Sequence, residues 1–199
     1  MRVQECIEEC INLNELNNKE MKDKKLDLKS KIRRIPEFKG VVFWDITTLL
    51  KDKHALRESI KQMADHYRNK GIDVIVSSEA RGFIFGATLA YELGVGFVPI
   101  RKKGKLPSKT VNLTYQKEYE SDTIEIHKDS IEPGQKVLII DDLLATGGTI
   151  EANTKLVEKL GGKVVGIGFL IELEYLHGRE TIGDKYEIFS IINYKTPNG

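Results

Sequence analysis

The sequence predicts one α/β domain, a mostly parallel twisted sheet of about five strands with helices on both faces. From Val41 onward, short apolar runs alternate with amphipathic stretches, the pattern of strands that alternate with helices. A length of 199 residues with 40% hydrophobic content suits a single core. The 31 Lys and Arg residues nearly balance the 30 Asp and Glu residues, leaving a formal charge of +1. We therefore expect neither nucleic-acid binding nor membrane binding driven by overall charge.

The first 31 residues differ from the rest and predict a charged extension, with the main domain at 32–199. An acidic start is followed by a basic stretch at 19–34, and the thin apolar stripe favours one or two surface helices docked on the domain. Cys6 and Cys10 are too close for a useful cross-link and too few for a metal cage, which favours a reducing compartment. No apolar run resembles a signal peptide or a membrane span, so we expect a cytoplasmic protein.

The main domain divides into elements at its glycines and polar turns. We expect strands at Val41–Ile46, Asp73–Ser77, Gly96–Ile100, Lys136–Ile140, Val164–Leu170 and Glu187–Ile192. Helices are expected at Ala55–Lys70, Phe83–Leu93 and Thr149–Leu160, which end at Gly71, Gly94 and Gly161, with a short helix near Tyr175–Ile182. The polar segment 101–122 reads as a long functional loop. The Val41 segment and the C-terminal strands should form a small hood over the sheet.

The stretch from Val137 to Thr149 carries the clearest chemistry. Four apolar residues predict a buried strand, and Asp141 and Asp142 follow at its carboxyl end, where open α/β sheets bind ligands. Two adjacent carboxylates need hydroxyl donors or a hydrated cation to bridge them. The small residues Ala145, Thr146, Gly147, Gly148 and Thr149 then open into a helix, which predicts a phosphate site at the helix N-terminus. The plainer alternative is an ordinary tight turn with Thr149 as the helix cap.

Positive charge follows two other predicted strands. Arg81 comes after a buried strand and before Gly82, so it could bind a second anion or simply lie on the surface. Arg101, Lys102, Lys103 and Lys105 cluster after the next strand, where they either concentrate charge for a phosphorylated substrate or form a solvated edge. His54, His66, His127 and His177 show no metal-ligand spacing, and no nucleophile elbow is present.

The segment Asp141–Thr149 resembles the phosphoribosyl-diphosphate motif of the type I phosphoribosyltransferases, and its Leu-Leu-Ala-Thr-Gly-Gly-Thr string is similar to the adenine-specific branch. Ser78–Phe83 resembles the family's diphosphate loop, which there contains a non-proline cis peptide. Arg101–Pro107 resembles the start of its flexible loop, and Leu176–Glu180 its C-terminal segment. The resemblance runs from about Ile32 to Tyr194 and leaves the extension out.

This resemblance implies transfer of a phosphoribosyl group from phosphoribosyl diphosphate to adenine, giving AMP and diphosphate. It implies Arg101 and Lys105, together with Lys102, as diphosphate ligands, and Glu118 and Tyr119 as catalytic residues in a closing loop, with Glu118 near the purine N7. It implies a base site at Val42, Phe43, Trp44 and Leu173. Mg²⁺ would be bound mainly through the substrate diphosphate, with no direct protein ligand. A homodimer is implied, in which Arg101 acts across the interface.

Three alternatives remain open. Trp44 stands where the family more often has a basic residue, and the Ile35–Gly40 run is two residues short, so another base is possible. A sensor of phosphoribosyl diphosphate would use the same fold without turnover, although Glu118, Tyr119 and the Lys-rich loop favour an enzyme. In the third alternative the N-terminal extension is the working part, an interaction arm. Removing the extension separates an enzyme, which keeps turnover, from an arm, which loses its partner.

Overall fold

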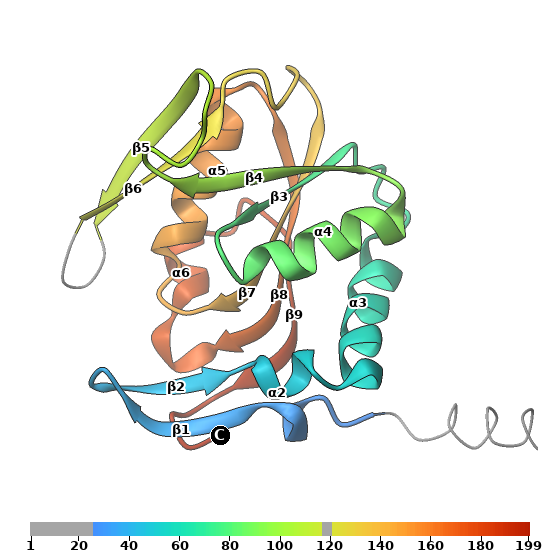
Figure 1. Ribbon diagram of the computed structural model, residues 1–199, viewed down its shortest axis with the longest axis vertical. Coiled ribbons are helices and arrows are strands. Elements are labelled where there is room, and N and C mark those ends of the chain that lie inside the picture. Colours follow the sequence, from blue (N-terminus) through green and yellow to red (C-terminus); the bar gives the residue numbers. More distant parts are fainter. Residues whose placement is uncertain (1–25, 117–120) are drawn as a thin grey trace, which may run out of the picture.

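The computed structural model describes residues 26–116 and 121–199 and contains a sheet of seven strands (Figure 1). Strand β7 (Lys136–Leu144) lies at the centre of its five parallel strands. The strand order is β5-β6-β4-β3-β7-β8-β9. Its parallel part comprises β3 (Val74–Ser78), β4 (Gly96–Lys102), β7, β8 (Lys163–Leu173) and β9 (Ile188–Tyr194). The prediction of a mostly parallel sheet flanked by helices is confirmed, and the sheet has seven strands rather than about five because the antiparallel strands β5 and β6 extend its edge.

Alternate side chains of β7 enter two different cores, which explains its uninterrupted apolar run. Leu138 and Ile140 pack in a core with α3 (Lys53–Tyr67) and α4 (Gly82–Leu93). Val137 and Ile139 pack in a second core with α5 (Gly148–Lys159). Figure 1 shows α3 and α4 on one side of the sheet, with α5 and α6 (Gly178–Ile182) on the other. Both faces are therefore buried, as parallel sheets require.

Two boundary signals in the sequence act as expected. Gly94 closes α4 in the left-handed conformation, with φ of 71°, and its N–H donates to Tyr91 O. Asp52 caps α3 by accepting hydrogen bonds from the backbone N–H groups of His54 and Ala55. A single turn of 3-10 helix, η2 (Glu174–Leu176), precedes α6, so the short helix expected there is divided in two.

The polar segment after β4 was wrongly predicted to be a loop. It forms most of a hairpin, β5 (Thr110–Gln116) and β6 (Ser121–His127), and β6 pairs antiparallel with the end of β4. The side chains of Val111, Leu113 and Tyr115 are partly buried and pack on the α5 core. This alternation of apolar and polar residues is a strand pattern that the high polarity of the segment conceals.

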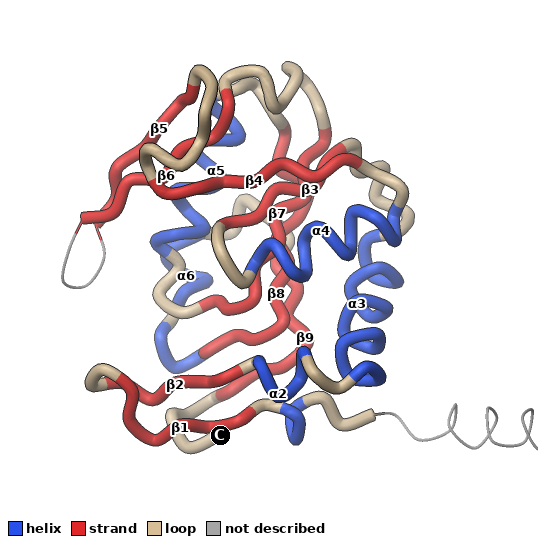
Figure 2. Tube along the Cα trace, in the orientation of Figure 1, coloured by secondary structure: helices blue, strands red, loops and turns tan. Residues whose placement is uncertain are grey.

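The hood also differs from its prediction. It is a separate hairpin of β1 (Arg33–Phe38) and β2 (Val41–Asp45), followed by the short helix α2 (Thr47–Leu50). Figure 2 shows this hairpin and the β5–β6 hairpin at opposite ends of the molecule. The expected C-terminal strand β9 is part of the main sheet and contacts the hood through side chains. The Trp44 and Tyr194 rings stack with their centroids 3.7 Å apart.

The described start of the chain has a single 3-10 turn before β1 and no α-helix. Leu28 precedes one 3-10 turn, η1 (Lys29–Lys31), and both Leu28 and Ile32 are buried in the core beside α3. Residues 1–25, where most of the predicted extension falls, lie outside the described ranges.

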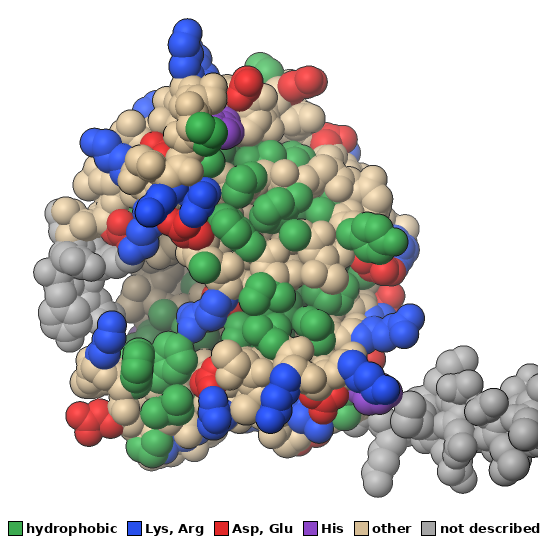
Figure 3. All heavy atoms as spheres, in the orientation of Figure 1, with side chains coloured by type: hydrophobic (Ala, Val, Ile, Leu, Met, Phe, Trp, Pro, Cys, Tyr) green, Lys and Arg blue, Asp and Glu red, His purple; other side chains and the backbone are tan. Residues whose placement is uncertain are grey.

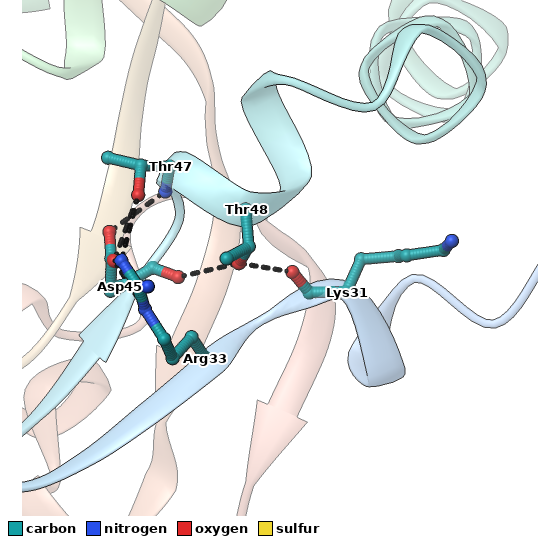
Figure 4. A network of polar contacts seen from close by, with 5 residues as sticks. All are labelled: Lys31, Arg33, Asp45, Thr47 and Thr48. Carbon is teal, nitrogen blue, oxygen red and sulfur yellow. Dashed lines mark hydrogen bonds and ion pairs between the residues drawn. The ribbon is translucent and has the colours of Figure 1, made fainter.

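Hydrogen bonds between β1, β2 and α2 fix the hood to this segment (Figure 4). Asp45 pairs with Arg33 and accepts hydrogen bonds from the N–H and hydroxyl of Thr47, both at 2.9 Å. The Thr48 hydroxyl donates to Lys31 O at 2.6 Å. The Thr47 N–H and the Arg33 guanidinium lower the pKa of Asp45 from 3.8 to about 2.

Candidate active site

The sheet topology places a crevice between β3 and β7. From β3 the chain passes through α4 to β4 on one side, and from β7 it passes through α5 to β8 on the other. The loops after β3 and β7 therefore diverge, and such a switch point is where open α/β sheets bind ligands. A pocket of about 440 Å³ lies there, lined by residues 78–81 and 141–150. These ranges contain the predicted acidic pair, the predicted phosphate loop and Arg81.

Asp141 and Asp142 lie on the part of β7 that extends beyond β3. Pairing between β3 and β7 ends at Val76 and Ile139, whereas pairing with β8 continues to Leu144. The two acids are only 9% and 6% exposed. The Asp142 N–H donates to Asp141 Oδ1 at 2.9 Å. Strand pairing and this hydrogen bond thus hold both carboxyl groups at the pocket.

Gly82 allows the N-terminus of α4 to approach the acidic pair. A Cβ atom on Gly82 would lie 2.4 Å from Asp141 Oδ1, which is closer than real contacts allow. The glycine that follows Arg81 is therefore needed for the local packing of α4 against β7.

Burial raises the pKa of Asp141 well above its usual value, and the neighbouring charge of Asp142 raises it further. Burial also raises the pKa of Asp142, although the Arg81 charge opposes this effect. Arg81 Nε lies 2.7 Å from Asp142 Oδ2. Ligand groups that donate hydrogen bonds or carry positive charge would stabilise the ionised pair.

The loop after β7 presents an uncapped helix N-terminus to the pocket. Gly147 is the N-cap of α5 with φ of +88°, and no side chain caps the helix. The alternative in which Thr149 is the cap is therefore wrong. Gly148, Thr149 and Ile150, in the first turn of α5, line the pocket. Their position makes the helix N-terminus available to an anion.

Tyr115, which sequence reasoning missed, reaches this loop from β5. Its hydroxyl lies 3.0 Å from the Thr149 hydroxyl. The alternation of apolar and polar residues in this segment could have predicted a strand that contains Tyr115. It could not have predicted the contact with Thr149, which lies 34 positions further along the chain.

The loop after β3 contains a cis peptide bond between Glu79 and Ala80, as the resemblance implied. Glu79 holds the end of β4: its carboxylate accepts hydrogen bonds from the Arg101 guanidinium at 3.0 Å and from the Lys102 N–H at 2.7 Å. Arg81 lies beside Asp142, with its guanidinium carbon 5.3 Å from the centre of the Phe43 ring. This loop therefore connects the acidic pair, the hood and β4.

The other predicted cationic residues lie outside the pocket lining. Arg101 is connected to the pocket lining through its hydrogen bond to Glu79. Its guanidinium also donates to Lys105 O at 3.2 Å. The Lys102 ammonium lies 3.8 Å from the Asp122 carboxylate. Lys105 is exposed, in a turn whose N–H groups donate to the buried carboxylate of Glu125.

The four residues of the predicted base site differ in how far their side chains are available to a base. Phe43 is half-buried and lies near Arg81, while Val42 packs on the core. The Trp44 side chain is 6% exposed and stacks on Tyr194, so only its backbone remains available to a base. Leu173 is buried at the end of β8.

Glu118 and Tyr119 lie outside the described residues. Within 26–116 and 121–199, no three His, Cys, Asp or Glu side chains converge to hold a metal ion. No helix of the described part has the length and apolar character required to cross a membrane.

Comparison with known proteins agrees with this geometry. Residues 45–198 match the family model described as a phosphoribosyl transferase domain. The chain is 54% identical over 169 residues to the adenine phosphoribosyltransferase of Acidobacterium capsulatum, covering 84% of this chain and 93% of the relative. It is 56% identical over 171 residues to that of Clostridium perfringens strain SM101, covering 85% and 99% of the two chains.

Solved structures of adenine phosphoribosyltransferases have the same fold. The Thermoanaerobacter pseudethanolicus structure has a TM-score of 0.82 at 53% identity, covering 84% of this chain and 98% of its own. The Giardia lamblia structure, a complex with 9-deazaadenine, has a TM-score of 0.82 at 40% identity, covering 85% and 97%. The residues matched by the family model, 45–198, include both pocket loops. The chain therefore belongs to the phosphoribosyltransferase family, in its adenine phosphoribosyltransferase branch.

Proposed function

We propose that the protein transfers the 5-phosphoribosyl group of phosphoribosyl diphosphate to adenine, giving AMP and diphosphate in purine salvage. The observation that carries this proposal is the pocket between β3 and β7, in which a buried acidic pair adjoins an uncapped helix N-terminus. The relatives that are 54% and 56% identical to this chain over 169 and 171 residues are adenine phosphoribosyltransferases.

The 5-phosphate of the donor binds at the loop Ala145–Thr149. The first turn of α5 supplies N–H groups and the positive end of the helix dipole, and the Thr146 and Thr149 hydroxyls supply further donors. Gly147 and Gly148 have no side chains between the backbone and the anion. This loop fixes one end of the donor.

Asp141 and Asp142 accept hydrogen bonds from the ribose hydroxyls. These donors stabilise the carboxylate forms that burial disfavours. The bond from C1 to the diphosphate oxygen breaks first, and the diphosphate leaves with the electron pair. The ionised acids then stabilise the positive charge that develops on the ribose ring. Adenine N9 forms the new bond to C1, and the proton it loses passes to the departing diphosphate.

The diphosphate binds to the loop after β3, with Arg81 as its main cation and Arg101, Lys102 and Lys105 at the end of β4. Arg81 exchanges its contact with Asp142 for a contact with the diphosphate. Mg²⁺ would fit this site as an ion carried by the substrate, because the buried carboxyl groups of Asp141 and Asp142 provide the oxygen atoms that Mg²⁺ and its bound water prefer. When bound, Mg²⁺ neutralises part of the diphosphate charge and so favours its departure.

The base lies between the hood and the pocket. Phe43 packs on one face of the purine, Leu173 closes the other, and the backbone of Val42–Trp44 reads its edge. Glu118 donates or accepts a proton near N7, and Tyr119 closes with it over the site. Support for this site comes from the position of Phe43 beside Arg81 and from the relative that binds 9-deazaadenine.

We also propose a homodimer formed through α4 and a cytoplasmic location. Residues 32–199 form the proposed catalytic domain, and the buried side chain of Leu28, just before it, packs in its core. Figure 3 shows apolar side chains gathered on the viewed face of the molecule, where α4 lies. On α4, Tyr91 is 88% exposed and Ile84 is 38% exposed, which is unusual for large apolar residues. The proposed occupant is a second copy of the chain, as the family resemblance implies. The cytoplasmic location is supported by the charge of phosphoribosyl diphosphate, because a charged donor does not cross a bilayer unaided.

A base panel tests the function. Turnover with phosphoribosyl diphosphate and Mg²⁺ is measured separately with adenine, hypoxanthine, guanine and orotate, and nucleotide and diphosphate are quantified together. We expect AMP and diphosphate in equal amounts from adenine alone. Turnover of another base would contradict the assigned base site. Tight donor binding without turnover would identify a sensor of phosphoribosyl diphosphate instead.

A further inference from the structure

An ion pair between a buried glutamate and a partly exposed arginine lies behind the phosphate loop, outside the pocket lining. Glu172, near the end of β8, is 3% exposed. Its carboxylate accepts two hydrogen bonds from Arg179 on α6, from Nε at 2.6 Å and from a terminal nitrogen at 2.7 Å. The Ser190 hydroxyl of β9 donates to the same carboxylate at 2.6 Å. This two-point geometry is specific to arginine.

The ion pair fixes the position of α6. Burial raises the pKa of Glu172, but the hydrogen bonds from Arg179 and Ser190 outweigh this effect and the pKa is lowered. Arg179 also donates to Ile188 O at 3.2 Å. A single guanidinium thus joins α6, a helix of five residues, to the ends of two strands.

The other side of α6 touches the phosphate loop through backbone atoms. A Cβ atom on Gly178 would lie 2.2 Å from Ala145 O, and one on Gly147 would lie 2.4 Å from Gly178 O. Only a glycine fits at either position, so the backbone of α6 packs directly against the backbone of the loop. The position of the loop backbone therefore depends on the position of α6.

We infer that Glu172 and Arg179 are positioning residues for donor binding. They hold Gly178 against Ala145 and Gly147, and so direct the first-turn N–H groups of α5 toward the 5-phosphate. The inference rests on the proposed function, since it assigns a role at the same site. Neither side chain lines the pocket among the described residues, so both act through the loop.

The test distinguishes variants that displace the phosphate loop from variants that only lower the stability of the protein. Arg179→Lys keeps the charge but loses the two-point contact, and Gly178→Ala pushes on Ala145 O without altering the ion pair. The matched controls are Lys185→Met, which removes the exposed ion pair with Glu158, and Gly96→Ala, whose Cβ would meet only Val74 Cγ2 at 3.6 Å. Each variant is assayed for the affinity of ribose 5-phosphate, the KM values of donor and adenine, and Tm.

We expect Arg179→Lys and Gly178→Ala each to weaken ribose 5-phosphate binding and raise the donor KM about tenfold, a change equivalent to ~1.4 kcal/mol. The adenine KM should change less than twofold, and the controls should match the wild type. Unchanged ribose 5-phosphate affinity in folded Arg179→Lys, even with a lower Tm, would show that the pair is only structural and overturn the inference. If either variant does not fold, Ser190→Ala, which removes one hydrogen bond, decides in the same way.

Ribose 5-phosphate binding also separates the two proposals. It needs no base and no turnover, so a wild-type protein inactive with adenine would contradict the proposed function alone. Loss of the sugar phosphate in the variants would still support the positioning role.

Discussion

At the scale of single residues, Asp142 decides whether the pocket can stabilise a cationic ribose. Asp142→Asn keeps the shape of the side chain but removes its charge, so we expect kcat to fall by about 10²-fold or more. Steady-state kinetics with adenine measure this change. Asp65→Asn is the control, because Asp65 pairs with Lys61 on the exposed surface of α3 and should leave kcat unchanged. A wild-type kcat in Asp142→Asn would remove this acid from the mechanism.

Asp141 should lower the stability of the folded protein at neutral pH. Burial and the charge of Asp142 raise its pKa above the usual value of 3.8, so between these two pKa values the folded state binds more protons than the unfolded chain. Stability is then lost as the pH rises through that window. Asp141→Asn removes this dependence and still accepts the hydrogen bond from the Asp142 N–H.

We therefore expect Asp141→Asn to be inactive but more stable, by at least ~1 kcal/mol or roughly 2–4 °C in Tm at pH 8. The gain in Tm should shrink toward pH 4, where the wild-type acid is protonated in the folded state. Thermal unfolding of both proteins across this range measures the difference. A gain that does not depend on pH, or a loss of stability at pH 8, would contradict the argument.

At the scale of elements, the parallel strands β3 and β7 were predictable because they are buried on both faces. Val74–Val76 and Val137–Ile140 are continuous apolar runs, and the glycines after α3 and α4 mark where the chain turns. The hairpin β5–β6 was not predictable in the same way, because Asn112 and Thr114 face solvent and dilute the apolar residues between them. The side chain of Trp44 was assigned to the base site from its neighbours in the sequence, whereas its stacking partner is 150 positions away.

The residues of the candidate site also divide into those that the sequence could predict and those that it could not. Asp141, Asp142 and the loop Ala145–Thr149 form one continuous segment, so their proximity follows from the sequence alone. Tyr115, Glu172 and Arg179 become relevant only through contacts between separate elements, which no local pattern contains.

The hood hairpin depends on Trp44 for its attachment to β9. Trp44→Ala removes the stacking on Tyr194 and leaves a cavity, so we expect a loss of about 3–5 kcal/mol in the free energy of unfolding. Because β2 carries the proposed base site, the adenine KM should also rise more than the donor KM. Denaturant unfolding and kinetics measure the two effects. Trp44→Phe, which keeps an aromatic ring, should lie close to the wild type, and equal effects of both variants on the adenine KM would argue against this attachment.

At the scale of the whole molecule, the exposed face of α4 should hold two copies together. Placing charges at Ile84 and Tyr91, as in the double variant Ile84→Lys and Tyr91→Glu, makes burial of this face unfavourable. We expect the wild type to sediment as a dimer and the variant as a monomer with an unchanged circular dichroism spectrum. Arg57→Ala is the control, since Arg57 lies on α3, outside this face. A wild type that sediments as a monomer, or a variant that remains a dimer, would exclude α4 as the interface.

The N-terminal residues should divide sharply between those that the enzyme needs and those that it does not. The pocket is lined by residues 78–81 and 141–150, and the packed core begins at Leu28. Removing residues 1–25 should therefore leave kcat and both KM values within twofold of the full chain. Removing residues 1–32 also removes the buried side chains of Leu28 and Ile32, each worth about 1.5–3 kcal/mol, so the Tm should fall. Kinetics and thermal unfolding of the two shortened chains make the comparison. Loss of turnover in the chain lacking only residues 1–25 would make the extension part of the enzyme, whereas full turnover leaves an interaction arm as its available role.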